Sequence, residues 1–180
     1  MKKLLLFFLL ICCVPAIAQS EGQSFCGGDE DGNYFPLIKK KKLLWSDTWY
    51  VEEYKGDITL NGKTYKAFRQ SWKNGTIDHM YLREEDGKVL QYDACCETET
   101  VRYDQFFEQG HTWQSEKKDV TYTLLSYHAE LQTPYCNYSN LMAVEARYEK
   151  VTFIFYYQKG YGYVGAKNRD KVISCATPEW

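Results

Sequence analysis

Apolar and polar residues alternate in short runs from Trp45 onward, and turn dipeptides separate these runs. Aromatic and β-branched residues dominate them, which is typical of strands. The dipeptides Asn61-Gly62, Asn74-Gly75 and Asp86-Gly87 separate successive runs. They favour tight hairpins because their residues tolerate the positive φ angles that such turns require. The pattern therefore predicts a meander of consecutive antiparallel hairpins.

The second half of the chain continues this pattern less regularly. Residues 94–113 form an irregular stretch with Gly110 at its turn, and residues 119–130 read as a further strand. Residues 139–149 and 150–158 also read as strands, although the first could pass for a helix with Ser139 as its cap. The segment VTFIFYY is apolar at both odd and even positions, which predicts a central strand covered on both faces.

These patterns predict an all-β protein: a mainly antiparallel meander forming a curved sheet or partial barrel. The chain has 180 residues, a length that suits one domain with a substantial core. We expect a signal peptide at residues 1–18, a flexible leader at 19–32 and a single β-rich domain at 33–180. The leader is expected because residues 19–32 are polar and rich in glycine.

The N-terminus has the pattern of a secretory signal peptide. Lys2 and Lys3 precede an apolar run that ends in the small-residue motif Ala16-Ile17-Ala18. The run is too short for a membrane span, and polar residues follow it. Cleavage before Gln19 predicts a secreted or periplasmic protein, with no transmembrane segment after the signal is removed.

Charge argues against nucleic acid as a partner. The chain carries 22 basic and 24 acidic side chains, a formal charge of −2, and loss of the two signal lysines makes it more acidic. A nucleic-acid-binding domain normally carries a basic surface instead. The run of lysines at residues 39–42 lies between aliphatic pairs, and we interpret it as a solvated turn or edge rather than a membrane contact.

Five cysteines remain after signal removal: Cys26, Cys95, Cys96, Cys136 and Cys175. In an oxidising compartment they are the disulfide candidates, with one left over. Cys95 and Cys96 are adjacent, and a bridge between neighbours closes a strained ring. We therefore expect each of them to pair elsewhere or one to stay free. At least one disulfide should join distant segments, through Cys136 or Cys175.

The segment GYGYVG at residues 160–165 matches the spacing of a dinucleotide-binding loop. That loop works only where a helix follows it and offers its N-terminus to the pyrophosphate. Too few residues remain after Gly165 for such a helix and the strand beyond it. We interpret Gly160 and Gly162 as turn or bulge positions, and Gly165 as a site of bending or close backbone approach.

Several segments together suggest a resemblance. The signal peptide, the hairpin YLREEDGKVLQYD, the segment EQGHTW and the terminal YYQKGYGYVGAK resemble a broad group of small, uncharacterised, secreted or periplasmic bacterial β-proteins. In that group an aromatic strand ends in G-x-G-x-V, which Gly160, Gly162 and Val164 match. The resemblance spans about Trp45 to Lys167, implies no catalytic residue, and favours a bacterial source.

No motif indicates catalysis, a metal or a cofactor. His79, His111 and His128 lie in separate segments, and none has a second histidine or a cysteine within four positions. No nucleophile signature of the G-x-S-x-G type occurs. We interpret the histidines as surface or strand residues, and we expect no catalytic residue, metal site or cofactor.

Aromatic content is the unusual quantity, with 16 Tyr, 5 Trp and 9 Phe. Tyrosine and tryptophan fill cores, and they also line recognition clefts. Trp49, Tyr81, Trp113 and Tyr161 have polar neighbours and are candidates for a ligand platform. The expected function is a non-enzymatic binding or carrier module for an apolar or glycan ligand. The alternatives are an envelope structural or assembly protein that binds another envelope protein, and last a hydrolase.

Overall fold

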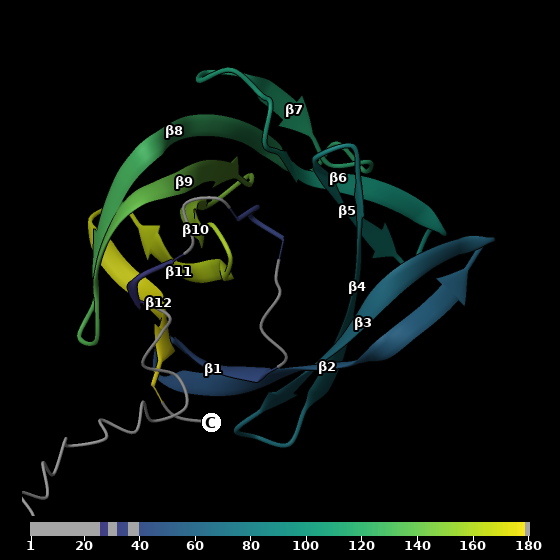
Figure 1. Ribbon diagram of the computed structural model, residues 1–180, viewed down its shortest axis with the longest axis horizontal. Helices are drawn as coiled ribbons and strands as arrows, with labels where there is room; N and C mark the ends of the chain where they lie inside the picture. Colours follow the sequence, from purple (N-terminus) through teal and green to yellow (C-terminus); the bar gives the residue numbers. More distant parts are fainter. Residues whose placement is uncertain (1–25, 29–31, 36–39, 179–180) are drawn as a thin grey trace, which may run out of the picture.

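The computed structural model describes residues 26–28, 32–35 and 40–178 (Figure 1). These residues form twelve β-strands and no α-helix. The strands are β1 (Lys40–Trp45), β2 (Thr48–Leu60), β3 (Lys63–Trp72), β4 (Ile77–Glu85), β5 (Lys88–Asp93), β6 (Thr98–Asp104), β7 (Thr112–Gln114), β8 (Thr121–Gln132), β9 (Asn137–Arg147), β10 (Thr152–Gln158), β11 (Gly162–Asn168) and β12 (Lys171–Thr177). The predicted signal peptide lies outside the described residues. Within the described residues, no helix is long and apolar enough to span a bilayer.

All twelve strands belong to one antiparallel sheet, in the order β6-β5-β4-β3-β2-β1-β12-β11-β10-β9-β8-β7. Every neighbouring pair except β1 and β12 is joined directly along the chain, so the sheet consists of two meanders that meet where β1 pairs with β12. The predicted fold class is confirmed.

The sheet curls so that its two edge strands, β6 and β7, approach each other (Figure 1). The edges do not form a backbone ladder among the described residues. The indole nitrogen of Trp113 in β7 instead donates to the carbonyl oxygen of Val101 in β6, at 2.8 Å. The sheet is therefore strongly curved but not closed into a barrel.

Two hydrophobic clusters cover opposite faces of the second meander. Met142 and Val144 in β9, with Tyr157 in β10, pack on the inner face against Tyr34 and other residues. Leu141 and Ala143, the chain neighbours of Met142, pack in the other cluster, because successive side chains of a strand point to opposite faces. Tyr156 and Tyr157 likewise belong to different clusters. The two-sided apolar pattern of VTFIFYY thus reflects a strand covered on both faces, as predicted.

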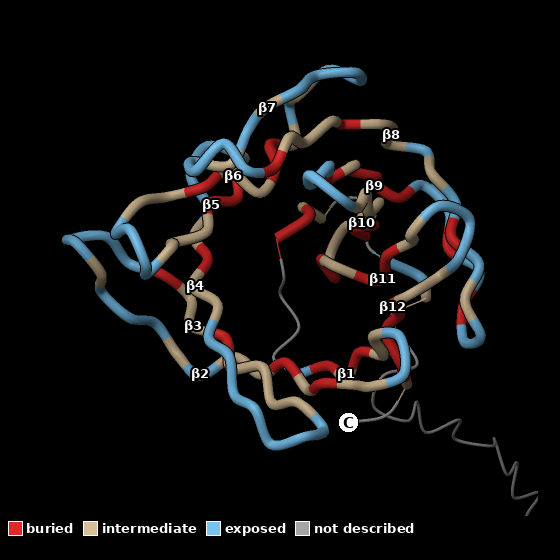
Figure 2. The backbone as a smooth tube through the Cα atoms, turned by 180° about the vertical axis from the view of Figure 1, so that it is seen from behind, coloured by how far each residue is buried: buried red, intermediate tan, exposed pale blue. Residues whose placement is uncertain are grey.

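A short N-terminal stretch fills part of the interior. The described stretch at residues 32–35 lies inside the ring of strands (Figure 2), and Tyr34 and Phe35 within it are buried. The amide of Gly160 donates to the carbonyl oxygen of Asn33 at 2.7 Å, and the hydroxyl of Tyr103 donates to the carbonyl oxygen of Tyr34. These contacts fix the stretch against strands from both halves of the sheet.

The hairpin predictions are confirmed at the three turns. Asn61 and Gly62 have φ angles of 47° and 76°, and Asp86 and Gly87 have 49° and 79°. These positive values at both central residues are those of tight primed turns. At the third turn only Gly75 is positive, at 87°, and the loop between β3 and β4 is correspondingly longer. The segment that could pass for a helix is the strand β9.

The GYGYVG segment is a backbone device of the sheet. Gly160 and Gly162 have φ angles of 73° and 81°, and the segment continues into β11 with a bulge opposite β10. At Gly165 a Cβ atom would lie 2.6 Å from the carbonyl oxygen of Ser174 in β12. The predicted positive φ angles, bulge and close backbone approach are all confirmed.

Candidate functional site

A cavity of about 270 Å³ lies against the inner face of the curved sheet, and we call it the inner-face cavity. It is bounded by strands from both meanders. Its lining is mainly aromatic and aliphatic, with a few charged or amide side chains. The residues are Lys41, Trp45, Tyr50, Glu52, Gln70, Trp72, Met80, Leu82, Val89, Arg102, Tyr103, Phe155, Tyr157 and Tyr163.

Strand alternation and register build one wall of this cavity. In β2, Tyr50 and Glu52 point to the same face because they are two positions apart. In β3 they lie directly opposite Trp72 and Gln70. The rings of Tyr50 and Trp72 pack with centroids 4.6 Å apart. This wall therefore pairs an aromatic surface with a polar one.

The polar part of this wall is a self-neutralised group. The ammonium of Lys41 lies 3.3 Å from the carboxylate of Glu52, and both side chains are almost fully buried. Gln70 donates to the same carboxylate at 2.8 Å, and Lys41 also donates to the carbonyl oxygen of Tyr163 at 3.2 Å. Each charge has a partner of opposite sign, as buried charges require.

The position of Lys41 corrects our interpretation of the lysine run as a solvated turn or edge. Strand β1 lies between β2 and β12 in the middle of the sheet, and Lys41 is 1% exposed. The alternation of Lys41, Leu43 and Trp45 places the lysine on the same face as two apolar side chains. This alternation in the sequence already indicated a strand with Lys41 on an apolar face. We did not use it because we interpreted the run of lysines from its composition.

Arg102 enters the cavity from the opposite wall through a β-bulge. Val89 in β5 pairs with Tyr103, whereas the next residue, Leu90, pairs with Val101. Arg102 is therefore the extra residue of β6. Regular alternation would place Arg102 and Tyr103 on opposite faces, but a bulge redirects a side chain locally. Both residues line the inner-face cavity as a result.

The guanidinium of Arg102 donates to the side-chain oxygen of Gln91 at 2.6 Å. Among the described residues no carboxylate forms an ion pair with it. Burial acts to lower the pKa of Arg102, but the hydroxyls of Tyr157 and Tyr122 offset this effect and the pKa stays above its ordinary value. The side chain is therefore a cation in a mostly apolar wall.

The tyrosine hydroxyls around the cavity are neutral. Burial raises the pKa of Tyr50, Tyr103 and Tyr163 above the ordinary value for tyrosine. They can donate or accept hydrogen bonds at neutral pH but contribute no negative charge. The formal charges of Lys41, Glu52 and Arg102 thus leave the lining with one net positive charge.

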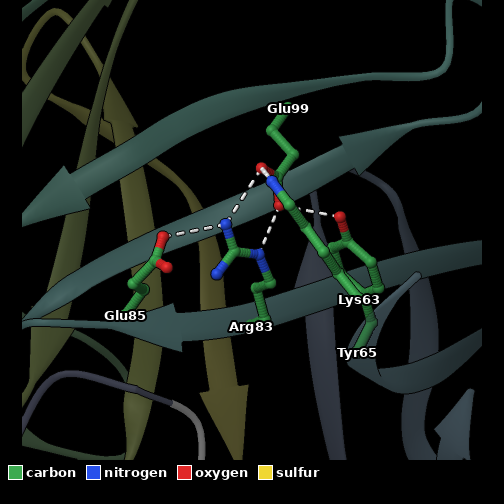
Figure 3. A network of polar contacts seen from close by, with 5 residues as sticks. All are labelled: Lys63, Tyr65, Arg83, Glu85 and Glu99. Carbon is green, nitrogen blue, oxygen red and sulfur yellow. Dashed lines mark hydrogen bonds and ion pairs between the residues drawn. The ribbon is translucent and has the colours of Figure 1, made fainter. Parts of the chain in front are cut away.

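A polar network on the outer face of the first meander has every charge paired (Figure 3). The carboxylate of Glu99 in β6 accepts from Tyr65 at 2.7 Å, from Lys63 at 2.5 Å and from the Arg83 guanidinium. Arg83 also contacts Glu85 at 2.9 Å. Hydrogen bonding from Arg83 lowers the pKa of Glu99 to about 2, against the opposing effect of burial. Because its charges are internally balanced, this network stabilises the sheet rather than offering a site.

A second hollow of about 810 Å³ is lined mostly by loop and edge positions. Gly28, Gln105 and Lys159 belong to its lining, together with the rings of Tyr34 and Tyr127. None of its lining residues also lines the inner-face cavity.

The four residues expected to form a ligand platform lie apart, and the lining of the inner-face cavity contains none of them. Trp49 lies under the ammonium of Lys42, with 5.1 Å to the ring centroid. Tyr81 stacks with His79, and Trp113 stacks with Tyr122.

Tyr161, the fourth of these residues, is 4% exposed, belongs to the hydrophobic cluster that contains Leu141 and Tyr156, and has the Lys41 ammonium 5.3 Å from its ring centroid. It therefore does not present an open face to a ligand. The aromatic wall of the inner-face cavity is made by other residues.

The cysteines form one of the bonds that we expected and one that we did not. Cys26 is bonded to Cys136, which confirms a disulfide between distant segments through Cys136. Cys95 and Cys96 are bonded to each other, so the expectation that each pairs elsewhere or one stays free is wrong. The pair lies in the turn between β5 and β6, where the tight backbone brings neighbouring sulfur atoms together. Among the described cysteines, Cys175 is the free thiol, and it is buried.

The histidines are exposed, as interpreted from the sequence. His79 and His111 contact aromatic rings, and His128 contacts the side chain of Asn140 at 3.3 Å. Within the described ranges, no group of three or more histidine, cysteine or carboxylate side chains is arranged to hold a metal ion.

The fold and cavity define a single-sheet, strongly curved antiparallel β-protein with an aromatic interior. No family model matches the chain, and a search of curated proteins gives no match. A search of solved structures finds similarity to a protein of Bacteroides fragilis described as exported, with a YmcC-like fold. The identity is 10%, the TM-score is 0.48, and the match covers 81% of this chain and 97% of the other.

A protein of Parabacteroides distasonis described as a lipoprotein is similar at 10% identity and a TM-score of 0.44, with 83% of this chain and 98% of the other covered.

Proposed function

We propose that this chain is a secreted or periplasmic, non-enzymatic binding or carrier protein that holds a small ligand in the inner-face cavity. The observation that carries the proposal is the lining: aromatic rings from both meanders surround a hollow that contains few polar groups. Ligand sites typically combine a concave apolar wall with a small number of placed polar groups. The cavity volume of about 270 Å³ lies near the lower end of the range for such sites, about 300 Å³.

The two other functions considered from the sequence have less support. Assembly by strand addition needs an open, extended sheet edge. Here β7 is only 3 residues long, and its Trp113 contacts the opposite edge strand. A hydrolase would need a base in the cavity. The three histidines are exposed and outside the cavity lining, and the carboxylate in the lining, Glu52, is paired with Lys41.

Binding can be tested with a neutral apolar dye, phenylnaphthylamine, whose fluorescence rises in an apolar site. We expect saturable binding by the wild type and loss of binding in Val89→Trp, because the added ring occupies the cavity that Val89 lines. The matched control is Ile77→Trp, an exposed aliphatic position on β4, which should bind as the wild type does. Equal binding by the two variants would contradict the proposal.

Native mass spectrometry provides a complementary readout. Protein purified from its own host should carry a small molecule that dissociates at moderate activation energy. The Val89→Trp variant should not carry it. A mass shift caused instead by a second polypeptide would favour the assembly function.

A further inference from the structure

Lys41, Arg83 and Arg102 are cationic side chains at buried or half-buried positions, and their partners differ. Lys41 is paired with Glu52 in the cavity, and Arg83 is paired with Glu99 and Glu85 on the outer face. Arg102 has a neutral amide partner, Gln91, and no carboxylate partner within the described chain. A cation withdrawn from water without a counter-charge costs free energy. This cost applies to Arg102 at the cavity wall, and other contacts of the fold must offset it.

The shape of the Arg102 guanidinium indicates which kind of ligand group would accept its hydrogen bonds. Arginine offers five N–H donors in a planar fork, which matches two oxygen atoms of one anionic group. Gln91 accepts from one terminal nitrogen of Arg102. The Arg102 side chain belongs to the cavity lining, and the Tyr157 hydroxyl is a further hydrogen-bonding neighbour, so the donors that Gln91 and Tyr157 do not occupy can reach a ligand held there.

The other lining residues determine what the rest of a bound molecule, away from Arg102, would contact. Trp45, Tyr50, Trp72, Phe155 and Tyr163 supply ring surfaces, and Met80, Leu82 and Val89 supply aliphatic surface. The Lys41 and Glu52 charges neutralise each other, and the tyrosine hydroxyls are uncharged. The lining therefore complements a molecule with one negative charge and an otherwise apolar body.

Resting on the proposed binding function, we propose that the natural ligand is a small amphipathic monoanion. Its oxyanion group is bound by Arg102, and its aliphatic or aromatic body lies against the cavity rings. A carboxylate is the simplest such group, and sulfate or phosphate monoesters share the same recognition chemistry.

The inference is tested by competition of decanoate, decanol and decylamine against bound phenylnaphthylamine. The three competitors have similar apolar chains and differ in the head group. The wild type should bind decanoate at least about tenfold more tightly than decanol, as a charge-assisted bidentate contact would produce. Decylamine should bind more weakly than either. Decyl sulfate and decyl phosphate, run in parallel, identify which oxyanion is preferred.

Arg102→Met keeps an unbranched apolar side chain in place of the arginine stem but removes the guanidinium and its charge. It should bind decanol as the wild type does and lose the preference for decanoate. Arg102→Lys should retain part of the preference, because lysine keeps the charge without the planar fork. The control is Arg147→Met, at an exposed arginine on β9 that is paired with Glu145, which should leave all affinities unchanged. Thermal melts establish that each variant is folded.

The outcomes separate the two proposals. If dye and decanol bind to the wild type but decanoate binds no better than decanol, the oxyanion inference is wrong and the binding function stands. If the wild type prefers decanoate and Arg102→Met keeps that preference, the role of Arg102 is wrong. If neither dye nor any competitor binds, the binding function itself fails. The wild-type preference alone decides the ligand class if Arg102→Met does not fold.

Discussion

Replacing Glu99 by Gln should destabilise the protein because Glu99 is the acceptor shared by the outer-face network in Figure 3. The substitution keeps the size of the side chain and removes its charge. Hydrogen bonding from Arg83 is the main reason that the pKa of Glu99 is lowered to about 2 in the folded protein. Burial opposes this effect, and hydrogen bonds from Lys63 and Tyr65 add to it.

The magnitude follows from the linkage between protonation and folding. A pKa of about 2 in the folded state, compared with 4.5 for an unperturbed glutamate, corresponds to at most about 3 kcal/mol in the free energy of unfolding. The Glu99 side chain is 18% exposed, so solvent screening lowers the expected effect to about 2 kcal/mol. Because the folded pKa is depressed, this stabilisation is complete above the unfolded pKa and is lost as pH falls towards 2.

The assay is urea unfolding of wild type and Glu99→Gln at a series of pH values. At pH near 7 the difference in free energy of unfolding should be about 2 kcal/mol, and it should shrink between the unfolded pKa and the folded pKa. Glu108→Gln, at an exposed position on a loop, is the control and should stay within about 0.5 kcal/mol of the wild type. A Glu99→Gln difference that is below that limit at neutral pH, or that does not change with pH, would refute the reasoning.

Three further perturbations probe the sheet. Replacing Cys26 and Cys136 together by Ser should lower the free energy of unfolding by up to about 5 kcal/mol in the chain-entropy treatment, because the bond joins residues separated by 110 positions; unreduced peptide mapping that finds these two thiols free would contradict the premise. Gly162→Ala should cost about 1 kcal/mol or more because its φ angle is 81°, and thermal melts of both the wild type and this variant should be insensitive to added NAD or ATP. Gly165→Ala should cost more than Gly162→Ala, since its Cβ atom would overlap backbone atoms of β12, and an equal or smaller loss in urea unfolding would count against that packing.

Local turn chemistry explains why most of the fold was predictable from the sequence. Asn61-Gly62 and Asp86-Gly87 adopt the positive φ angles that their residue types favour, so neighbouring strands and their antiparallel sense follow directly. Strand β6 was not predicted because the adjacent Cys95 and Cys96 and the polar residues after them mask its alternation. The meeting of β1 with β12 also has no local signal, because it joins residues more than a hundred positions apart.

The sequence predicted the aromatic character of the candidate site but not the residues that form it. High aromatic content indicated a ring-lined cleft, but choosing Trp49 and Tyr161 by their polar neighbours selected residues outside the cavity. The cavity rings come from strands that are brought together by curvature of the sheet. Which of two faces lies inside that curve depends on the register of all the strands, and no single stretch of sequence carries that information.

Arg102 shows this limit most clearly. Simple alternation in TETVRYD would place Arg102 on the face opposite Tyr103, where an arginine on a curved sheet would meet water. The extra residue in β6 changes this, because Val89 pairs with Tyr103 while Leu90 pairs with Val101. Bulges are frequent beside functional sites because they redirect a side chain without disturbing the rest of the ladder. Here the redirected side chain is Arg102, the cation of the cavity lining that has no carboxylate partner among the described residues. The bulge therefore explains both why alternation in the sequence did not predict the position of Arg102 and why the proposed binding site carries a positive charge.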